Sequence, residues 1–213
     1  MANRIKEKAR LIEVKNYFDV VVVGGGIAGA AAAIAAARNK ARVCLIERYC
    51  VIGGLATAGN INVYLPLCDG NGHQVITGLA EEFMKISISD GYGKIPDCWL
   101  DEKNIEQRRK KRLEAEFNPW NLALELEKML VMEGVEIMYD TRFCSVIKKK
   151  NRITHIVVEN KKGRFAIECC AAVDATGDAD VCVAVGETVE IVNNNVACGW
   201  FFYFDGKSVQ RRA

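Results

Sequence analysis

Residues 20–23 are all valine and run directly into three glycines at positions 24–26. An uninterrupted run of valines is typical of a strand buried on both faces, as in a parallel sheet. An alanine-rich segment follows the glycines, which predicts a helix directly after the turn. The order of strand, glycine turn and helix predicts an α/β fold that begins with a nucleotide-binding crossover.

The glycines have the spacing Gly-x-Gly-x-x-Gly, with Gly24, Gly26 and Gly29 at the motif positions. In this motif the first glycine allows a tight turn, the second leaves room for a pyrophosphate, and the third allows close packing of helix and strand. The start of the helix, at Ile27 and Ala28, offers free backbone N–H groups and the positive end of the helix dipole to phosphates.

A second apolar strand is expected at residues 41–47, and it ends in Glu47. Glu47 lies 18 residues after Gly29, close to the spacing of about 20 for a carboxylate that binds an adenosine ribose. The same carboxylate would repel a 2′-phosphate, which argues against NADP. The alternative is a plain strand-to-helix turn with a solvated Glu47. The glycine motif alone does not distinguish a plain turn from a nucleotide site. The order of first strand, helix, second strand and terminal acid favours the nucleotide site.

The composition fits a globular protein of one large domain, or of one domain and part of another. Half of the 213 residues are hydrophobic and the net charge is only +2, so we expect neither a nucleic-acid-binding nor a membrane-surface protein. The nine cysteines are an odd number, which argues against a complete disulfide framework. We expect Cys44, Cys144, Cys169 and Cys170, which lie in apolar strands, to be buried thiols in a reducing cytoplasm.

No metal site, secretion signal or membrane helix is expected. Cys68 and His73 are close in sequence, but two candidate ligands on a loop make a poor metal site. Residues 1–16 lack an apolar signal core. Residues 20–37 carry no charge over 18 positions, but three glycines interrupt them.

Helices are expected at residues 79–89 and 118–134, the second with Asn118 as its cap and Pro119 at its first position. The charged segment 101–116 is interpreted as a solvated helix face. Polyanion binding is the disfavoured alternative, because acids flank its basic run and no aromatic residues interleave.

Strands separated by polar turns follow and predict an antiparallel meander, with members at residues 135–139, 142–148, 153–159 and 164–169. A buried strand then ends in the turn Ala175-Thr176-Gly177-Asp178, and a short helix is expected at residues 179–185. A further strand is expected at residues 199–204.

Taken in order, the glycine turn, Glu47-Arg48 with the glycine loop 53–59, the meander and the turn at 174–178 resemble the FAD-dependent oxidoreductases of the glutathione-reductase-like superfamily. The likeness covers about residues 17–186. It implies a Rossmann-like FAD-binding fold, a parallel sheet with helices on one face and the β-meander on the other. It also implies FAD as the cofactor and a small molecule as the substrate.

The resemblance implies a role for each matching segment. The three motif glycines would hold the FAD pyrophosphate, Glu47 the adenosine ribose, and Arg48 and Phe143 would lie near the adenine. The second glycine loop would run toward the isoalloxazine, and the Ala-Thr-Gly-Asp turn would close over the cofactor. The residues implied to bind FAD are Gly24, Gly26, Ile27, Ala28, Gly29, Glu47, Arg48, Gly53, Gly54, Ala56, Thr57, Phe143, Ala175, Thr176, Gly177 and Asp178.

Two departures from the family pattern matter. Disulfide reductases of this superfamily carry a Cys-x4-Cys pair just after the second strand, whereas residues 55–59 contain no thiol, so a dithiol mechanism is not expected. Such enzymes also return to the FAD domain late in the chain. We therefore expect the N-terminal part of a longer enzyme. Its FAD-binding domain would comprise residues 17–64 and 118–190, with an insertion at 65–117 and the start of a truncated substrate domain at 191–213.

The leading interpretation is an FAD-binding oxidoreductase that moves a hydride or electron pair between flavin and a small organic substrate. One alternative is a non-catalytic fragment that needs a second polypeptide half to hold flavin. The candidate protein partners are the missing C-terminal half and a further copy of the chain in a homo-oligomer. Another alternative is an NAD-dependent dehydrogenase, which would predict further strand–helix units after Glu47. No catalytic acid or base is identified. His73, in a loop, is the weak candidate, and His155, in a meander strand, is interpreted as structural.

Overall fold

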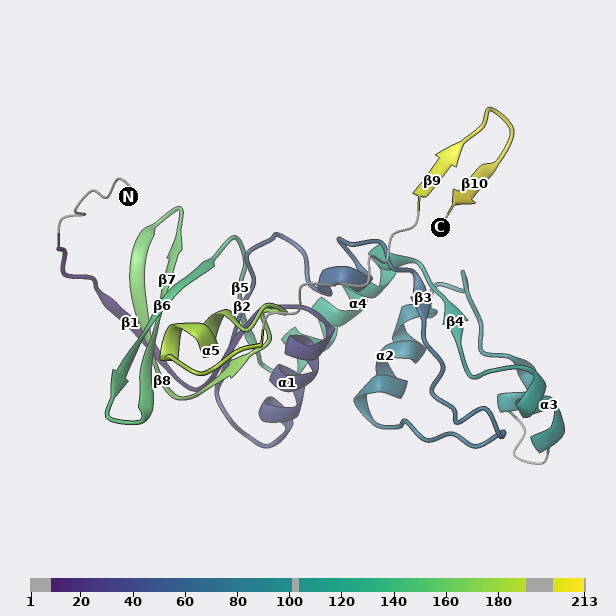
Figure 1. The fold of residues 1–213 in the computed structure, drawn as a ribbon, viewed down its shortest axis with the longest axis horizontal. Helices are drawn as coiled ribbons and strands as arrows, with labels where there is room; N and C mark the ends of the chain where they lie inside the picture. The colour runs from purple at the N-terminus through teal and green to yellow at the C-terminus, as the bar shows by residue number, and fades with distance from the viewer. Residues whose placement is uncertain (1–8, 101–103, 191–200, 213) are drawn as a thin grey trace.

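A mixed sheet of six strands organises the computed structural model, which describes residues 9–100, 104–190 and 201–212. The strand order is β5-β2-β1-β8-β7-β6, in which β5, β2, β1 and β8 are mutually parallel and β8, β7 and β6 are antiparallel (Figure 1). The strands are β1 (Val14–Val23), β2 (Val43–Ile46), β5 (Glu136–Met138), β6 (Arg142–Lys149), β7 (Arg152–Asn160) and β8 (Gly163–Asp174).

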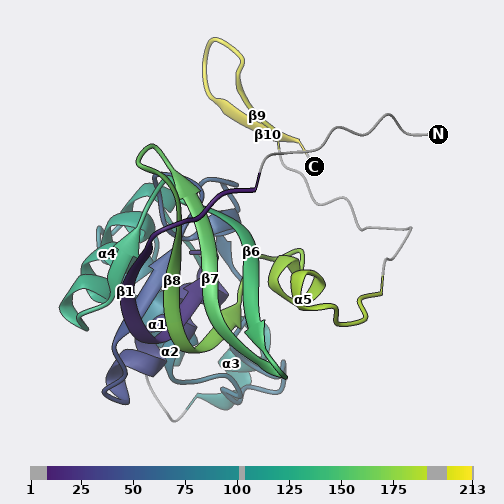
Figure 2. The same cartoon turned by 90° about the vertical axis from the view of Figure 1, so that its left-hand side faces the viewer.

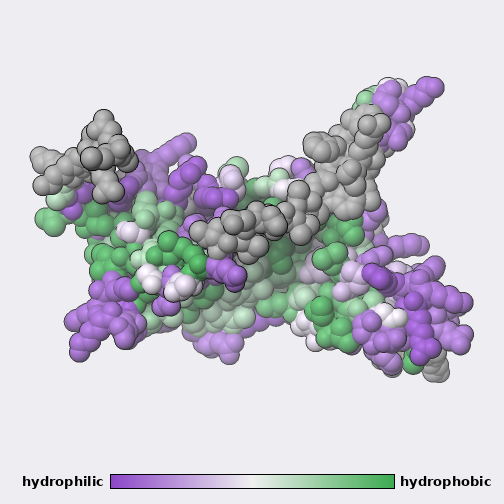
Figure 3. Space-filling model, viewed as in Figure 1, coloured by the Kyte–Doolittle hydropathy of each residue, from purple (hydrophilic) through white to green (hydrophobic). Residues whose placement is uncertain are grey.

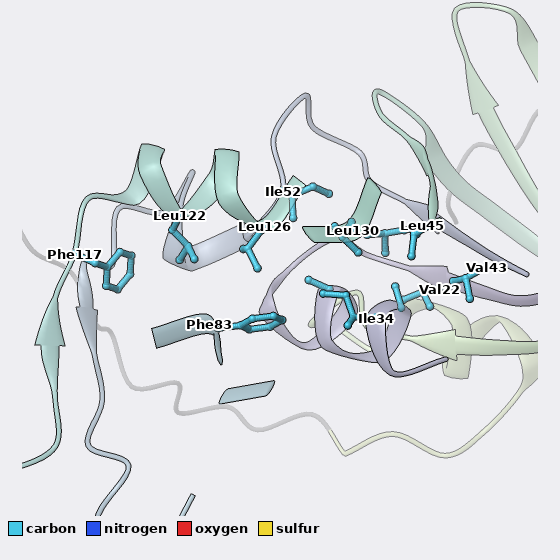
Figure 4. Close-up of a cluster of buried hydrophobic side chains, with 13 residues drawn as sticks. Val22, Ile34, Val43, Leu45, Ile52, Phe83, Phe117, Leu122, Leu126 and Leu130 are labelled. Carbon is cyan, nitrogen blue, oxygen red and sulfur yellow. The ribbon is translucent and has the colours of Figure 1, made fainter. Parts of the chain in front are cut away.

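One face of the parallel part is covered by α1 (Ile27–Arg38) and α4 (Pro119–Met132), and α2 (Leu79–Ser87) packs against α4. Burial of each large aliphatic or aromatic side chain stabilises the fold by about 1.5–3 kcal/mol relative to exposure. The inaccessible side chains that join these helices to the sheet include Val22, Ile34, Val43, Leu45, Phe83, Leu122, Leu126 and Leu130 (Figure 4).

The opposite face is covered by the meander. Val21 and Val23 of β1 pack there against the apolar side chains of β7 and β8 and against Val181 of α5 (Asp180–Val185). Strands β8, β7 and β6 lie side by side over this face, with α5 beside β6 (Figure 2). The end of β1 is therefore buried on both faces, as its valine run predicts. The expected fold, with helices on one face and a meander on the other, is confirmed.

Residues 135–139 are not part of the meander, contrary to the prediction. They form β5, which pairs in parallel with β2 at the other edge of the sheet, so that Leu45 lies opposite Ile137. The reason is topological: α4 returns the chain across the sheet, and a crossover of this kind delivers a parallel strand. The expected meander strand at 164–169 and the buried strand before the Ala175 turn are one strand, not two, because β8 is continuous and joins the meander to the parallel strands.

Two of the four cysteines expected to be buried are exposed. Cys44 and Cys169 are buried, whereas Cys144 and Cys170 face solvent, because successive side chains of a strand point to opposite faces. Burial raises the pKa of the Cys44 thiol to about 12 and that of Cys169 to about 11. The eight cysteines in the described ranges are free thiols.

The predicted helices at 79–89 and 118–134 are confirmed as α2 and α4, and the Asn118 side chain accepts a hydrogen bond from the Trp120 backbone N–H at 3.1 Å. The short helix expected at 179–185 is confirmed as α5. None of the helices in the described part of the chain is long and apolar enough to span a membrane.

The segment between β2 and α4 has a small apolar cluster of its own, made of Leu67, Met84, Leu113 and Ala115. The same segment between β2 and α4 also contains β3 (Val63–Tyr64), η2 (Asp97–Trp99), α3 (Ile105–Lys110) and β4 (Ala115–Glu116). Strand β4 pairs with β3.

The interpretation of the charged segment 101–116 as a solvated helix face is confirmed for α3, none of whose residues is buried, whereas Leu113 and Ala115 beyond it are buried. Helix α3 ends at Lys110, and the Arg108 guanidinium lies 4.8 Å from the Trp99 ring and donates to the Cys98 carbonyl at 2.9 Å. The surface around α3 is hydrophilic (Figure 3).

The strand expected at 199–204 appears as β9 (Phe201–Phe204), paired with β10 (Val209–Arg212). Residues 199 and 200 lie outside the described ranges.

Candidate functional site

A cavity of about 960 Å³ opens where β1, β2 and β8 end. This volume is at the upper end of the range of small-molecule pockets. Its walls come from five segments, residues 23–28, 46–49, 53–59, 141–143 and 175–180, in which Gly25, Thr57 and Ala179 do not line the cavity. The place is the expected one for a ligand of an open α/β sheet, because the chain leaves β1 toward β2 on one side while β8 lies on the other.

All the residues predicted to bind the cofactor line this cavity except Gly29 and Thr57. Gly29 is buried behind the wall, where an added Cβ would lie 1.8 Å from the Gly24 carbonyl oxygen. A glycine is therefore required at position 29 so that α1 can pack closely against the turn at Gly24. Thr57 is fully buried, and its hydroxyl donates to the Ile52 carbonyl at 2.6 Å. Both residues hold wall segments in place and are set back from the ligand space.

The start of α1 is suited to a phosphate. Gly26 is its N-cap, no side chain caps the helix, and no acidic residue lies in its first turn. The first N–H groups of a helix have no partner within it, so those of Ile27 and Ala28 can serve an anion. A Cβ added to Gly26 would meet no atom within 4 Å and would project into the open cavity.

Two contacts explain why glycine stands at two further wall positions. Gly24 has φ +103°, and a Cβ there would lie 2.3 Å from the Ala175 carbonyl oxygen. The second glycine loop lies directly on the first, because the Gly53 N–H donates to the Gly25 carbonyl at 2.8 Å. A Cβ on Gly54 would lie 3.1 Å from the Gly26 Cα. Segments distant in sequence thus meet backbone to backbone around the end of β1.

Glu47 follows β2 and is only 5% exposed. Its Oε2 accepts from the Gly25 N–H at 2.7 Å and its Oε1 accepts from the Tyr49 N–H at 2.8 Å. A carboxylate offers about four acceptor positions, so these two bonds fix the side chain and leave each oxygen able to accept from a hydroxyl in the cavity. Glu47 thus presents a fixed carboxylate to the cavity.

Several wall residues were not predicted from the sequence. Tyr49 lies beside Arg48, whose guanidinium is 4.9 Å from its ring. Tyr49 could have been found from its position next to the Glu47 motif. Thr141 and Arg142 had no such signal, because they reach the cavity only through the unpredicted pairing of β5 with β2. The other unpredicted wall residues are Val23, Ile46, Leu55, Ala58, Gly59 and Asp180.

Neither histidine lines the cavity. His73 is exposed in a loop where its backbone N–H donates to Asp69, and His155 lies in β7 beside the Thr154 hydroxyl. In the part of the chain that the structure describes, no group of three or more histidine, cysteine or acidic side chains could hold a metal ion.

The fold is that of a Rossmann-like α/β protein with a large cavity where its central strands end. The uncapped helix start, the open space at Gly26 and the anchored carboxylate at Glu47 fit the phosphates and ribose of an adenine dinucleotide. A family model described as "FAD dependent oxidoreductase" matches residues 19–198. The chain belongs to the FAD-dependent oxidoreductase family, as its motifs predict, and FAD is the cofactor of that family.

The chain is also similar to individual proteins, and the two solved structures among them share its fold. A thioredoxin reductase of Ureaplasma parvum serovar 3 is 29% identical over 89 residues, which are 42% of this chain and 29% of that protein. The THI4 structure from Thermovibrio ammonificans matches with a TM-score of 0.54 and 21% identity, over 79% of this chain and 61% of that one. The L-proline dehydrogenase of P. horikoshii matches with a TM-score of 0.55 and 17% identity, over 85% and 58%. The chain thus spans less than two thirds of each of these relatives.

Proposed function

We propose that the cavity binds FAD and that the chain serves an oxidoreductase acting on a small organic substrate. When bound, FAD supplies the acceptance and release of a hydride or an electron pair. The observation that carries the proposal is the uncapped start of α1, which faces open space at Gly26 beside the anchored Glu47.

Each wall has a proposed part in holding the cofactor. The N–H groups of Ile27 and Ala28 would bind the pyrophosphate, and Glu47 would accept hydrogen bonds from the adenosine ribose. Arg48 and Phe143 would enclose the adenine. The remaining predicted wall residues lie on the second glycine loop and on the turn after β8, and we propose that they hold the rest of the cofactor: Gly53, Gly54, Ala56, Ala175, Thr176, Gly177 and Asp178.

The two alternatives are less well supported. An NAD-dependent dehydrogenase would continue with strand–helix units after β2, whereas here the chain continues with the segment containing α2 and α3 and later with the meander. A non-catalytic fragment is not favoured by the match to a family of FAD-dependent enzymes over residues 19–198.

We also propose that residues 17–64 and 118–190 form the FAD-binding domain, that 65–117 is an insertion, and that 191–213 begins a substrate domain. The apolar cluster within the insertion supports the division, as does the absence of residues 65–117 from the described cavity walls. Limited proteolysis of the FAD-loaded protein tests it. The first cuts are expected within 65–117, and first cuts within β1 or β8 would contradict the division.

The nine cysteines suit a reducing compartment, and we propose the cytoplasm. Cell fractionation tests this assignment, and recovery of the protein from an oxidising compartment would contradict it.

Titration of the purified 213-residue protein with FAD, followed by flavin fluorescence, tests the proposed site. The wild type should bind saturably. Gly26→Val should weaken binding about ten- to hundredfold, the equivalent of roughly 1.4–2.8 kcal/mol, because the added side chain fills the cradle. Since that side chain meets no protein atom within 4 Å at its Cβ, the circular dichroism spectrum should stay unchanged.

Ala35→Val, at an exposed position of the same helix, is the matched control and should bind FAD as the wild type does. Unchanged FAD affinity in Gly26→Val would contradict the proposed site. Tight binding of NAD without any binding of FAD would favour the dehydrogenase alternative.

A further inference from the structure

Asp174, the last residue of β8, is joined to the turn beyond it by three hydrogen bonds. Its Oδ1 accepts from the Thr176 backbone N–H at 3.1 Å and from the Thr176 hydroxyl at 2.7 Å. Its Oδ2 accepts from the Cys182 N–H at 2.9 Å. The Thr176 hydroxyl oxygen in turn accepts from the Asp180 N–H at 3.0 Å. One carboxylate therefore connects the end of a central strand to the first turn of α5.

The chain enclosed by these bonds forms one wall of the cavity. Residues 175–178 and Asp180 line it, whereas Asp174 itself does not. The wall is also held from outside, because Val181 is buried against the sheet and the Lys148 ammonium donates to the Val185 carbonyl. The end of β8 and α5 are thus both held in place by the rest of the fold. The hydrogen bonds of Asp174 determine the shape of the turn between them.

The backbone of this turn contains a conformation that needs such support. Ala179 has φ +59° and ψ 35°, in the left-handed region. A residue with a Cβ is rarely found there and persists only where the surrounding structure determines its conformation. The hydrogen bonds of Asp174 and Thr176 span this position from both sides.

The negative charge of Asp174 strengthens the hydrogen bonds that hold the turn. Although desolvation alone would raise the pKa of Asp174, the N–H groups of Cys182 and Thr176 more than offset it, and the pKa lies below its ordinary value. The carboxylate is thus charged at neutral pH, and charge-assisted hydrogen bonds are about twice as strong as neutral ones.

We infer that Asp174 is a positioning residue, which sets the affinity for FAD by holding the 175–180 turn in the shape of the cavity wall without touching the cofactor. This inference rests on the proposed function of the cavity. It assigns a role to a side chain that lies behind the wall and outside the predicted cofactor residues.

Asp174→Asn tests the inference in the full chain. The variant has the same shape and keeps one oxygen for Thr176, but its amide NH2 cannot accept from the Cys182 N–H. We expect FAD to bind at least about tenfold more weakly, by flavin fluorescence. Asp19→Asn is the matched control, because Asp19 also accepts a backbone N–H, that of Arg42 at 2.7 Å. Asp19 lies near the middle of β1 and does not line the cavity, so Asp19→Asn should leave FAD affinity within twofold of the wild type.

Hydrogen exchange of the FAD-free proteins is the second readout, because a general loss of stability would not reproduce its pattern. In Asp174→Asn the amides of Thr176, Asp180 and Cys182 should exchange at least tenfold faster, while those of β1 keep the wild-type rate. If the variant fails to fold, hydrogen exchange of the wild-type protein is the remaining test. A Cys182 amide that exchanges without protection in the wild type would overturn the inference.

The outcomes separate the two claims. A wild-type chain that does not bind FAD overturns the proposed function and this inference with it. A wild type that binds FAD, with Asp174→Asn binding equally well, overturns only the role of Asp174.

Discussion

At the scale of single residues, the first glycine turn separates a requirement of the fold from a requirement of the ligand. Gly24 and Gly26 are two positions apart and have different surroundings. A Cβ at Gly24 would collide with the Ala175 carbonyl, and its φ of +103° disfavours any side chain. A Cβ at Gly26 would meet nothing within 4 Å, and its φ of −66° suits any residue.

We therefore predict opposite effects of the same substitution. Gly24→Ala should lower the free energy of unfolding by roughly 2–4 kcal/mol, from the collision and the backbone strain together. Gly26→Ala should leave the stability equal or up to about 1 kcal/mol higher, because alanine restricts the unfolded chain, and should weaken FAD binding. Urea unfolding and FAD titration of both variants measure this. Equal losses of stability would contradict the surroundings described for Gly26.

At the scale of elements, one arginine connects three helices. Arg38 ends α1, and its guanidinium makes two hydrogen bonds to Glu82 of α2, at 2.9 and 2.7 Å, and one of 2.8 Å to Glu133, which follows α4. The hydrogen bond from Arg38 is the main reason that the pKa of Glu82 lies below its ordinary value of 4.5. This cluster fixes α2, and with it the segment between β2 and α4, to the helices that cover the sheet.

Arg38→Met should destabilise the protein by about 1 kcal/mol or less at pH 7, since the side chains are more than a quarter exposed and solvent screens the pairs. Because the pKa of Glu82 is lowered on folding, its contribution is present above the ordinary pKa and is lost as the pH falls through the folded value. The difference between variant and wild type should therefore shrink below about pH 4 and at high salt.

Urea unfolding at several pH values measures this difference. Lys85→Met is the control, because it removes an ion pair with Glu81 inside a single helix and should cost only about 0.2–0.5 kcal/mol. A difference for Arg38→Met that persists in full at pH 3 would show that packing, and not charge, is responsible.

At the scale of the whole molecule, the cavity joins parts of the chain that are about 150 residues apart in sequence, from Gly24 to Gly177. A ligand there contacts the ends of the central strands β1, β2 and β8 at once. Its binding energy therefore adds to the stability of the sheet as a unit. Binding to the folded state alone stabilises by about 2.7 kcal/mol when the ligand is at a hundred times its dissociation constant.

We predict that FAD at this concentration raises the thermal midpoint by about 5–10 °C, since each kcal/mol corresponds to roughly 2–4 °C for a chain of this size. Scanning fluorimetry with an extrinsic dye measures the shift. Gly26→Val should have a wild-type midpoint without FAD and only a small part of the shift with it. A full rise of the midpoint with FAD in that variant, or an equal rise with NAD in the wild type, would contradict the prediction.

The sequence by itself determined the β1-α1-β2 crossover, most of the residues that line the cavity, and the family. These features are local: a valine run, a glycine spacing and a terminal acid specify backbone geometry within about 30 residues. The same holds for α4, whose cap and first proline stand next to each other. Where a residue type has one physical reason to occur at a position, as a capping asparagine or a turn glycine has, the sequence alone is sufficient to predict the local structure.

Only the tertiary structure decided which distant segments meet. The strand at 136–138 has the same local pattern as a meander strand, and its place beside β2 depends on the path of α4 across the sheet. That placement brings Thr141 and Arg142 to the cavity. The hydrogen bond of Asp174 to the Cys182 N–H depends likewise on a partner in another element, α5. Pairing between strands is a long-range choice, made by burial of whole faces, and no short stretch of sequence encodes it.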